Sequence, residues 1–230
     1  IKETFEKDCG YDVYFQVRNA KEYGIPQSRE RIYCIGFKNE TEFKYPAPIK
    51  LDKTVYDFLQ NRFDKKYLLK QKGVHFITRA INYQKSYTQV NGDIILCQKR
   101  NQQFNWHGDF VYHPKLKEDT STPETDPNLF KVADFEEDYY LQNNPAKYAI
   151  KRAGDEEMMF KASDKEIDPS YGRFRKLTPR ECLRLMGFDD TFNIVVSDTE
   201  TYKQAGNSIV VNVLMALLRK IDITKYGTEI

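Results

Sequence analysis

The spacing of apolar residues near the start of the chain predicts two β-strands. Residues 11–17 alternate apolar and polar positions, with Val13 and Phe15 on one face, because alternate side chains share a face of an extended chain. A second strand is expected at residues 31–37, after a loop at residues 19–27 that contains a glycine and a proline. We expect the two strands to form a long-looped hairpin at the edge of a sheet.

A polar segment leads into the second strand. Gln27, Arg29 and Arg31 stand at alternate positions and would point to the same side of an extended chain. The next four residues, from Ile32 to Ile35, read Ile-Tyr-Cys-Ile. We therefore expect the apolar end of this segment to be buried and the two guanidiniums to face another group.

Residues 177–187 predict a complete short helix. Thr178 is expected as the N-cap, Pro179 occupies the first helical position, and Glu181 completes a capping box. Gly187 is expected to end the helix, since glycine is the preferred residue just after a helix C-terminus.

A second helix is predicted to begin near residues 207–208 and to run to about residue 221. Its apolar residues recur at helical spacing and form a wide face: Ile209, Val210, Val213, Leu214, Leu217, Leu218 and Ile221. A face of this kind has to be buried. We expect the helix to pack against another part of the chain or against a second copy.

The remaining elements are less regular. Residues 1–8 resemble the end of an amphipathic helix, and residues 51–60 resemble a short helix. Residues 73–115 are typical of short strands joined by turns, with a hairpin signal at Asn91-Gly92. The whole pattern predicts a mixed α/β chain.

Charge is distributed unevenly, although the net charge is only +2. Residues 44–115 hold 13 Lys/Arg against 5 Asp/Glu, a net charge of +8, whereas residues 116–170 hold 7 against 14, a net charge of −7. A basic block that is also rich in Asn, Gln and Tyr suits a nucleic-acid surface. The alternative is an ordinary solvated face. We expect the acidic stretch to face away from nucleic acid.

Cysteine usage and hydropathy narrow the class of protein. The four cysteines lie far apart and form no CxxC pair, so no metal site is expected. No apolar run approaches the roughly 18 residues of a membrane span, and the first residues carry no apolar signal segment. These features indicate a cytoplasmic protein with free thiols and no membrane partner.

Three motifs follow one another along the chain. The first is QSRER at residues 27–31, the second is RKLTPRECLRLMGF at residues 175–188, and the third is QAGNS at residues 204–208. In this order they resemble motifs VIII (QxRxR), IX (RxLTxRExxRLxGF) and X (QxGNS) of the DNA (cytosine-5)-methyltransferases. The resemblance covers roughly residues 11–37 and 171–221, and the stretch between them corresponds by position to the target-recognition region of that family.

The resemblance implies a reaction and a fold. A methyl group would pass from S-adenosylmethionine to C5 of a cytosine flipped out of double-stranded DNA, in a bacterial restriction-modification system. The fold would be α/β, or α+β for this chain alone: edge strands and the C-terminal helix of a Rossmann-like methyltransferase domain, plus a small β-rich target-recognition domain. Residues 1–44 and 173–230 are expected in the catalytic domain and residues 45–172 in the recognition domain.

The resemblance also implies roles for motif VIII. Arg31 would lie in the cytosine pocket, where a guanidinium stabilises the negative charge that develops on the ring. Arg29 is expected to contact backbone or to brace the loop, and Gln27 to hold that loop. From the residues alone, surface ion pairs with Glu30 or Glu22 are the alternative.

Motif X is implied in binding S-adenosylmethionine. We expect Asn207 and Ser208 to open a helix whose free N–H groups seat the carboxylate of the cofactor. An ordinary N-cap is compatible with this role. The polar residues of motif IX are expected to form a scaffold for the recognition region: Arg175, Arg180, Glu181 and Arg184.

Residues that read the DNA sequence are expected in the basic block, in the loop at residues 99–107. Arginine recognises guanine, and asparagine and glutamine recognise adenine, in the major groove, whereas lysines bind phosphate. A polar turn between strands is the alternative. The candidates are Lys99, Arg100, Asn101, Gln102, Gln103 and Trp106.

Three motifs of the family are missing from these 230 residues: an FxGxG loop for the cofactor, a Pro-Cys nucleophile and a Glu-Asn-Val motif. We therefore expect the C-terminal part of the enzyme, either a truncated piece or one subunit of a split enzyme. It would be inactive without the N-terminal catalytic half, supplied in cis or in trans. The alternatives are a non-enzymatic DNA-binding module and an RNA methyltransferase of the same fold.

Overall fold

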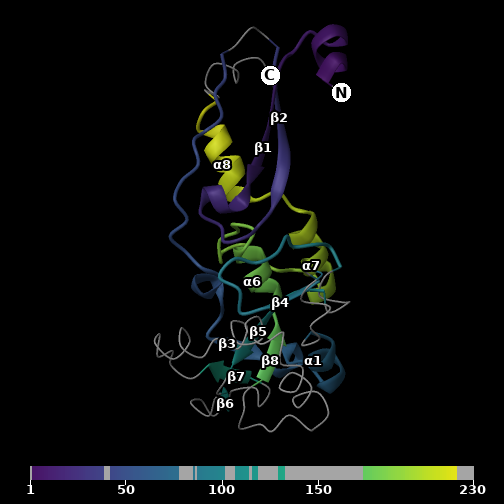
Figure 1. Cartoon of the computed structure of the whole chain (residues 1–230), viewed down its shortest axis with the longest axis vertical. Coiled ribbons are helices and arrows are strands. Elements are labelled where there is room, and N and C mark those ends of the chain that lie inside the picture. The colour runs from purple at the N-terminus through teal and green to yellow at the C-terminus, as the bar shows by residue number, and fades with distance from the viewer. Residues whose placement is uncertain are drawn as a thin grey trace.

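The computed structural model describes residues 2–38, 42–77, 85, 87–101, 107–113, 116–118, 129–132 and 173–221. The molecule is elongated, with a hairpin and helix α8 (Val211–Leu218) at one end and two small sheets at the other (Figure 1). Helices α6 (Pro179–Arg184) and α7 (Asp198–Asn207) lie between these ends. The predicted mixture of helix and strand is confirmed.

The hairpin consists of strands β1 (Asp12–Asn19) and β2 (Glu30–Phe37) in antiparallel register, with Arg18 opposite Arg31. The pair of strands predicted from the alternating pattern is therefore confirmed. A π-helical turn, η1 (Thr4–Asp8), precedes β1 and buries no side chain.

The connection between the two strands has an ordered start. It contains the 3-10 turn η2 (Ala20–Tyr23), which Asn19 caps by accepting a hydrogen bond from the amide of Lys21. Gly24 follows with a φ of 81°, a backbone conformation that glycine adopts without a steric penalty. The segment that carries motif VIII begins just after this turn.

The expectation that the apolar end of the second strand is buried is confirmed for one of its two faces only. Ile32 is 70% exposed and Cys34 is also exposed, whereas Gln27 and Arg29 are buried. Alternate side chains of a strand point to opposite faces, and only the face that carries Tyr33 packs on the core. The apolar run therefore divides between core and surface, and the buried polar groups are satisfied by backbone, as described below.

Two three-stranded sheets form the far end of the molecule (Figure 1). One is antiparallel, in the order β3 (Arg62–Asp64), β7 (Leu129–Val132) and β6 (Leu116–Glu118). In the other, the central strand pairs in parallel with the first and antiparallel with the third, in the order β4 (Thr88–Val90), β5 (Gly108–His113) and β8 (Arg173–Lys176).

The turn at Asn91 does not form the predicted hairpin. Asn91 adopts a φ of 50°, as suits a turn residue, but the chain then leaves the sheet. The amide of Val55 donates to the carbonyl of Asp93, and the amide of Ile95 donates to the carbonyl of Pro26. Ile95 is almost fully buried in the core, so tertiary burial outweighs the local preference for a hairpin.

Short helical segments connect the strands at this end. They are η3 (Val55–Phe58), η4 (Lys65–Tyr67) and α1 (Gln71–Ile77). The short helix expected within residues 51–60 is thus a single 3-10 turn.

Helix α6 has the predicted start. The hydroxyl of Thr178 accepts a hydrogen bond from the amide of Glu181, whose carboxylate accepts one from the amide of Thr178. Gly187 follows the helix with a φ of 85°. The capping box and the glycine stop read from the sequence are confirmed.

The helix predicted from residues 207–208 onward is wrong at its start. Asn207 is the last residue of α7, and α8 begins only at Val211. Ser208 and Val210 have extended backbone between the two helices, and the amide of Val211 donates to the carbonyl of Met186. This contact with the end of the motif IX segment fixes where α8 begins.

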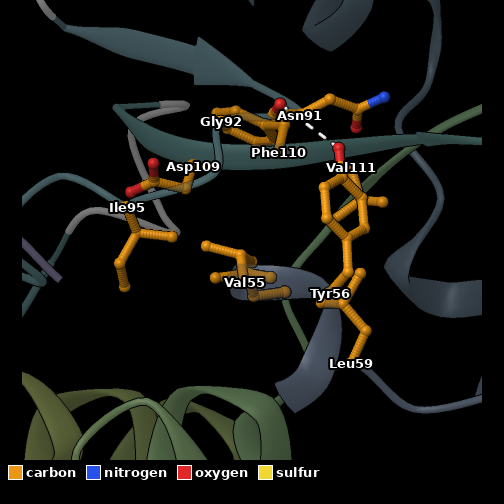
Figure 2. A pocket seen from close by; sticks show the side chains of 10 residues that line it. Val55, Tyr56, Leu59, Asn91, Gly92, Ile95, Asp109, Phe110 and Val111 are labelled. Atoms are coloured by element: carbon orange, nitrogen blue, oxygen red, sulfur yellow. Dashed lines mark hydrogen bonds between the residues drawn. The ribbon is translucent and has the colours of Figure 1, made fainter. Parts of the chain in front are cut away.

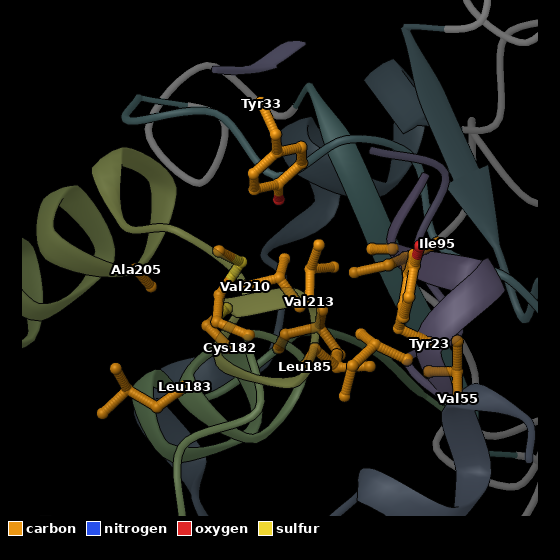
Figure 3. Close-up of a cluster of buried hydrophobic side chains, with 14 of the residues drawn as sticks. Tyr23, Tyr33, Val55, Ile95, Cys182, Leu183, Leu185, Ala205, Val210 and Val213 are labelled. Atoms are coloured by element: carbon orange, nitrogen blue, oxygen red, sulfur yellow. The ribbon is translucent and has the colours of Figure 1, made fainter. Parts of the chain in front are cut away.

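The largest buried cluster draws side chains from the hairpin, from the middle of the chain and from the C-terminal helices (Figure 3). Helix α8 contributes Val213 and Leu217, while Met215 and Leu218 stay partly exposed. Domain boundaries at residues 44 and 172 stay a prediction. Within the described ranges, no helix is long and apolar enough to cross a membrane.

Candidate functional site

Gln27 joins the hairpin loop to two other segments. Its buried side-chain amide donates to the carbonyl of Leu185 just after α6, at 2.8 Å, and its Oε1 accepts from the amide of Gln98, at 3.0 Å. Ile95 also pairs with Gln27 through an isolated parallel bridge. These contacts hold residues 95–98 between the hairpin loop and helix α6.

Arg29 lies deeper than an ordinary arginine and is only 5% exposed. Its Nη1 donates to the carbonyl of Gln98 at 2.8 Å, and its Nη2 donates to the carbonyls of Gly206 and Ser208, both at 3.0 Å. Burial lowers the pKa of Arg29, an effect opposed by the nearby Cys97. Because arginine keeps its charge in proteins, Arg29 presents charged donors to three backbone carbonyls.

Arg31 lies at the surface beside Cys97. Its Nη1 donates to the carbonyl of Glu30 at 2.6 Å, and its Nη2 lies 3.4 Å from the Sγ of Cys97. The Nη1 of Arg29 lies 3.6 Å from the same sulfur. The two guanidiniums of motif VIII therefore converge on one thiol, and the exposed Arg31 keeps donors available for a bound molecule.

The carboxylates of Glu22 and Glu30 are engaged with Asn19 instead of the two arginines. Glu22 accepts from the backbone amide of Asn19 at 3.2 Å, and Glu30 accepts from its side-chain amide at 3.4 Å. The structure thus gives no support to surface ion pairs as the explanation of Arg29 and Arg31.

The candidate DNA-reading loop starts at the segment that Gln27 and Arg29 hold. Lys99, Arg100 and Asn101 are exposed there. The predictions for Gln102, Gln103 and Trp106 lie outside the described residues. The exposed cations directly follow the buried Gln98, so they project from a fixed base.

The last residue of α7 and the residue that follows it are the other predicted site residues. Asn207 is exposed and Ser208 is half-buried. The Ser208 hydroxyl donates to the carbonyl of Ala205 at 2.9 Å. Because Asn207 ends α7 and the first amide of α8 already donates to Met186, the expectation that these residues open a helix with free N–H groups is wrong.

A buried ionic cluster supports the motif IX segment. Arg175 and Glu181 form a bidentate ion pair with N–O distances of 2.7 and 2.8 Å, and both side chains have no exposed surface. The Nε of Arg175 donates to the Nε2 of His113 at 2.9 Å, and the guanidinium lies over the ring of Phe63. Burial lowers the pKa of His113, so His113 is neutral and accepts this hydrogen bond.

Arg184 and Arg180 differ from Arg175 in their surroundings. Arg184 forms an ion pair with Asp190 and donates to the carbonyl of Leu59 at 3.2 Å. The hydrogen bond described for Arg180 is to the carbonyl of Asp189, at 3.5 Å. Through Arg184 and Glu181, helix α6 holds the start of the middle region by its backbone.

A small pocket beside residues 95–98 contains a buried carboxylate that the sequence did not single out (Figure 2). Both oxygens of Asp109 accept from the amide of Leu96, at 3.1 and 3.2 Å. Burial raises the pKa of Asp109 to about 8. Its neighbours in the pocket include Val55, Ile95 and Val111. The available signal was a carboxylate directly before the apolar residues Phe110 and Val111 of a strand. The part of the chain described here holds no group of three or more metal-binding side chains.

Comparison with known families decides what this arrangement is. The sequence profile described as C-5 cytosine-specific DNA methylase matches residues 1–222. The chain belongs to the C-5 cytosine-specific DNA methylase family. This confirms the family to which motifs VIII, IX and X pointed, and residues 27–31 and 204–208, which Arg29 brings together, are two of those motifs.

Curated relatives of this C-5 cytosine methylase chain are Type II methyltransferases. M.SsoII of Shigella sonnei is 32% identical over an alignment of 229 residues that covers 97% of this chain and 48% of the relative. M.HhaI of Haemophilus parahaemolyticus is 29% identical over 96% of this chain and 56% of its own length. The chain therefore spans about half the length of the curated relatives it matches.

Solved structures show the same fold at lower sequence identity. DNMT2 of Spodoptera frugiperda matches with a TM-score of 0.57 at 19% identity, over 93% of this chain and 59% of its own. The Dnmt2 methyltransferase of S. pombe matches with a TM-score of 0.55 at 16% identity, over 98% and 61%. The C-5 cytosine methylase chain thus has part of a methyltransferase fold.

Proposed function

We propose that this chain is the C-terminal, DNA-recognition part of a DNA cytosine-5 methyltransferase of a bacterial restriction-modification system. The complete enzyme transfers a methyl group from S-adenosylmethionine to C5 of a flipped cytosine. The observation that carries the proposal is the meeting of motif VIII, the basic loop and motif X at Arg29. The family membership and the names of the curated relatives support the same reaction.

Arg31 is the residue we assign to the cytosine pocket. A cytosine in a duplex is shielded by stacking, so the enzyme has to flip it out before reaction. A thiolate then adds to C6, and negative charge develops on the ring. Arg31 is exposed beside Cys97, and its guanidinium donates in a fixed fork that suits the O2 of the ring. Gln27 and Arg29 support this pocket from the buried side.

The nucleophile and the main cofactor motifs lie on another polypeptide segment in this proposal. None of the four cysteines follows a proline, and burial raises the pKa of the Cys182 thiol, which makes it a poor nucleophile. The relatives are about twice as long as the match. A second segment of similar size, in cis or in trans, would supply the missing groups.

The outer face of the hairpin fits a partner segment of this kind. Val17 and Ile32 lie opposite each other and are 53% and 70% exposed. Phe15 and Cys34 form the next pair on the same face and are also exposed. An apolar face on a two-stranded sheet marks an interaction surface, and we assign it to the other half of the methyltransferase.

The turn at Asn207 and Ser208 fits only a small part of S-adenosylmethionine. Both residues reach the surface, but the hydroxyl of Ser208 already donates to Ala205. Asn207 therefore offers the most accessible polar group, and we assign these two residues to the edge of the cofactor site. S-adenosylmethionine itself supplies the methyl group, and the rest of its site belongs to the missing segment.

Double-stranded DNA is the proposed substrate, and the cytoplasm is the proposed location. Lys99, Arg100 and Asn101 project from the segment held by Gln27 and Arg29. Their chemistry suits phosphate and base-edge contacts in the major groove. Gln102, Gln103 and Trp106 complete the proposed DNA-reading loop.

Complementation tests the proposal. This chain is co-expressed with the N-terminal half of a Type II relative such as M.SsoII, and 5-methylcytosine in the host DNA is mapped by bisulfite sequencing. We expect methylation with the wild-type chain and none with Arg31→Ala. Arg18→Ala is the matched control, because Arg18 lies opposite Arg31 in the hairpin. It should retain methylation.

The same experiment separates the alternative functions. Binding of duplex DNA by the purified chain without methylation in any complemented strain would favour a non-enzymatic DNA-binding module. Methylation of cellular RNA in place of DNA would favour an RNA methyltransferase. Loss of methylation with both arginine variants would remove the special role assigned to Arg31.

A further inference from the structure

Three segments that are far apart in the sequence meet at a single buried side chain. Arg29 comes from the hairpin, and Gln98 lies at the base of the candidate DNA-reading loop. Gly206 lies in the last turn of α7, and Ser208 directly follows that helix. The described contacts of the Arg29 terminal nitrogens with oxygen are all to backbone carbonyls. Arg29 thus holds the backbone of the other two segments, in addition to its contact with the sulfur of Cys97.

Backbone packing around Gly206 brings the same two segments together. A Cβ atom at Gly206 would lie 2.5 Å from the backbone carbonyl carbon of Lys99 and 2.5 Å from the backbone nitrogen of Arg100. Real Cβ atoms do not approach backbone this closely, so only glycine fits. The base of the loop and the last turn of α7 therefore touch directly, with no side chain between them.

We propose that Arg29 is a positioning residue that couples the DNA-reading loop to the turn at residues 206–208. Removal of Arg29 would leave one buried and two partly buried carbonyls without their charged donor. The loop base and the turn would then loosen together. In the reverse direction, a duplex that orders the loop would also order the turn through Arg29. This coupling rests on the proposed function only in its assumption that the loop contacts DNA.

The neighbouring contacts explain why loss of Arg29 need not unfold the chain. Gln27 holds the same loop base independently, through the amide of Gln98 and the carbonyl of Leu185. Asp109 holds the amide of Leu96. The hairpin and the α6 segment therefore keep their own contacts when Arg29 is replaced.

Amide hydrogen exchange of the 230-residue chain tests the coupling. In Arg29→Gln, we expect exchange in residues 97–101 and in residues 206–209 to accelerate together, by about tenfold or more, since charged hydrogen bonds are lost from both. Exchange in β1 and β5 should not change. Arg18→Gln is the matched control, because the contacts described for its side chain are with Gln16 of its own hairpin and with Tyr45, and it should leave both segments as in the wild type.

A second arm adds a duplex DNA of mixed sequence. In the wild type, we expect the duplex to slow exchange in both segments. In Arg29→Gln, it should slow exchange in residues 97–101 alone. Acceleration of only one segment in the free variant would overturn the coupling, as would protection by DNA that stops at the loop in the wild type.

Two further results of the exchange experiment also have a defined meaning. If the wild-type chain does not bind duplex DNA, the proposed function fails. Hydrogen exchange measured without DNA then still supports or overturns the coupling of the two segments through Arg29. If Arg29→Gln accelerates exchange throughout the chain, Arg29→Lys replaces it. Lysine keeps the charge but donates from one point, so it should loosen both segments by a smaller, equal factor. Loosening of one segment alone would again overturn the coupling.

Discussion

Replacing Glu181 by glutamine tests the energetics of the buried ionic cluster. The change keeps the size of the side chain but removes its charge, and it leaves Arg175 fully buried without its carboxylate. The two residues are joined at 2.7 and 2.8 Å, and neither side chain has exposed surface. Removing one partner of such a pair costs about 3–5 kcal/mol, because an uncompensated charge stays buried.

Two further contacts of Glu181 add to the expected loss in the free energy of unfolding. Glu181 also accepts from the backbone amides of Thr178 and Gln60, each at 2.8 Å, and glutamine retains an oxygen for only part of this network. A loss of about 3–5 kcal/mol is a large share of the roughly 5–15 kcal/mol by which typical domains are stable. We therefore expect Glu181→Gln to be folded at low temperature and clearly destabilised.

Urea unfolding followed by circular dichroism measures the effect. The series is Glu181→Gln, Arg175→Met and the double variant, with Glu200→Gln as control, because Glu200 forms an exposed pair with Lys203. The control should lose less than about 1 kcal/mol. The double variant should lose less than the sum of the two single changes. A loss below about 1 kcal/mol for Glu181→Gln, or strict additivity, would refute the reasoning.

Three further predictions follow from other contacts. Burial raises the pKa of Asp109 to about 8 from its ordinary 3.8, so the folded state binds the proton more tightly than the unfolded state. The free energy of unfolding should therefore fall as pH rises between these values, by at most about 1.4 kcal/mol per pH unit. Urea titrations at several pH values measure this slope, and Asp109→Asn should lack it. Arg100→Ala should weaken duplex binding and reduce the salt slope by about one, whereas Lys44→Ala should not, as fluorescence anisotropy against salt concentration would show. Ile32→Asp should abolish complementation by the other half without lowering the stability of this chain, since Ile32 is 70% exposed.

Elements whose causes are local could be predicted from the sequence. Helix α6 is specified by Thr178 and Glu181 at its start and by Gly187 after its end, and all three act within a few residues. The strands of the hairpin were also predictable, because alternation acts along one strand. The family could be recognised because its motifs are short and contiguous.

Features set by distant contacts could not be predicted. Arg29 contacts backbone as expected, but its acceptors could not be named because they are carbonyls about 70 and 180 positions away in the chain. The break between α7 and α8 depends on a tertiary hydrogen bond to Met186. The start of α7 did have a local signal that the sequence analysis missed. Ser197 precedes Glu200 by three residues, and its hydroxyl oxygen accepts a hydrogen bond from the amide of Glu200.

The candidate site likewise contains some residues that could be predicted from the sequence and others that could not. Motif VIII was found from its spacing, but Cys97, which both of its arginines contact, belongs to no recognisable motif. Only the fold shows that Cys97 lies beside these arginines. Asp109 and His113 were missed because burial, which shifts the pKa of each, depends on sheets formed by distant strands.

The most direct test of the central claim is methyl transfer from labelled S-adenosylmethionine to duplex DNA by the purified proteins. This chain carries Arg31 and the basic loop but no Pro-Cys nucleophile. We predict no incorporation by the chain alone and incorporation when the N-terminal half of a relative is added. Turnover by these 230 residues alone would contradict the account.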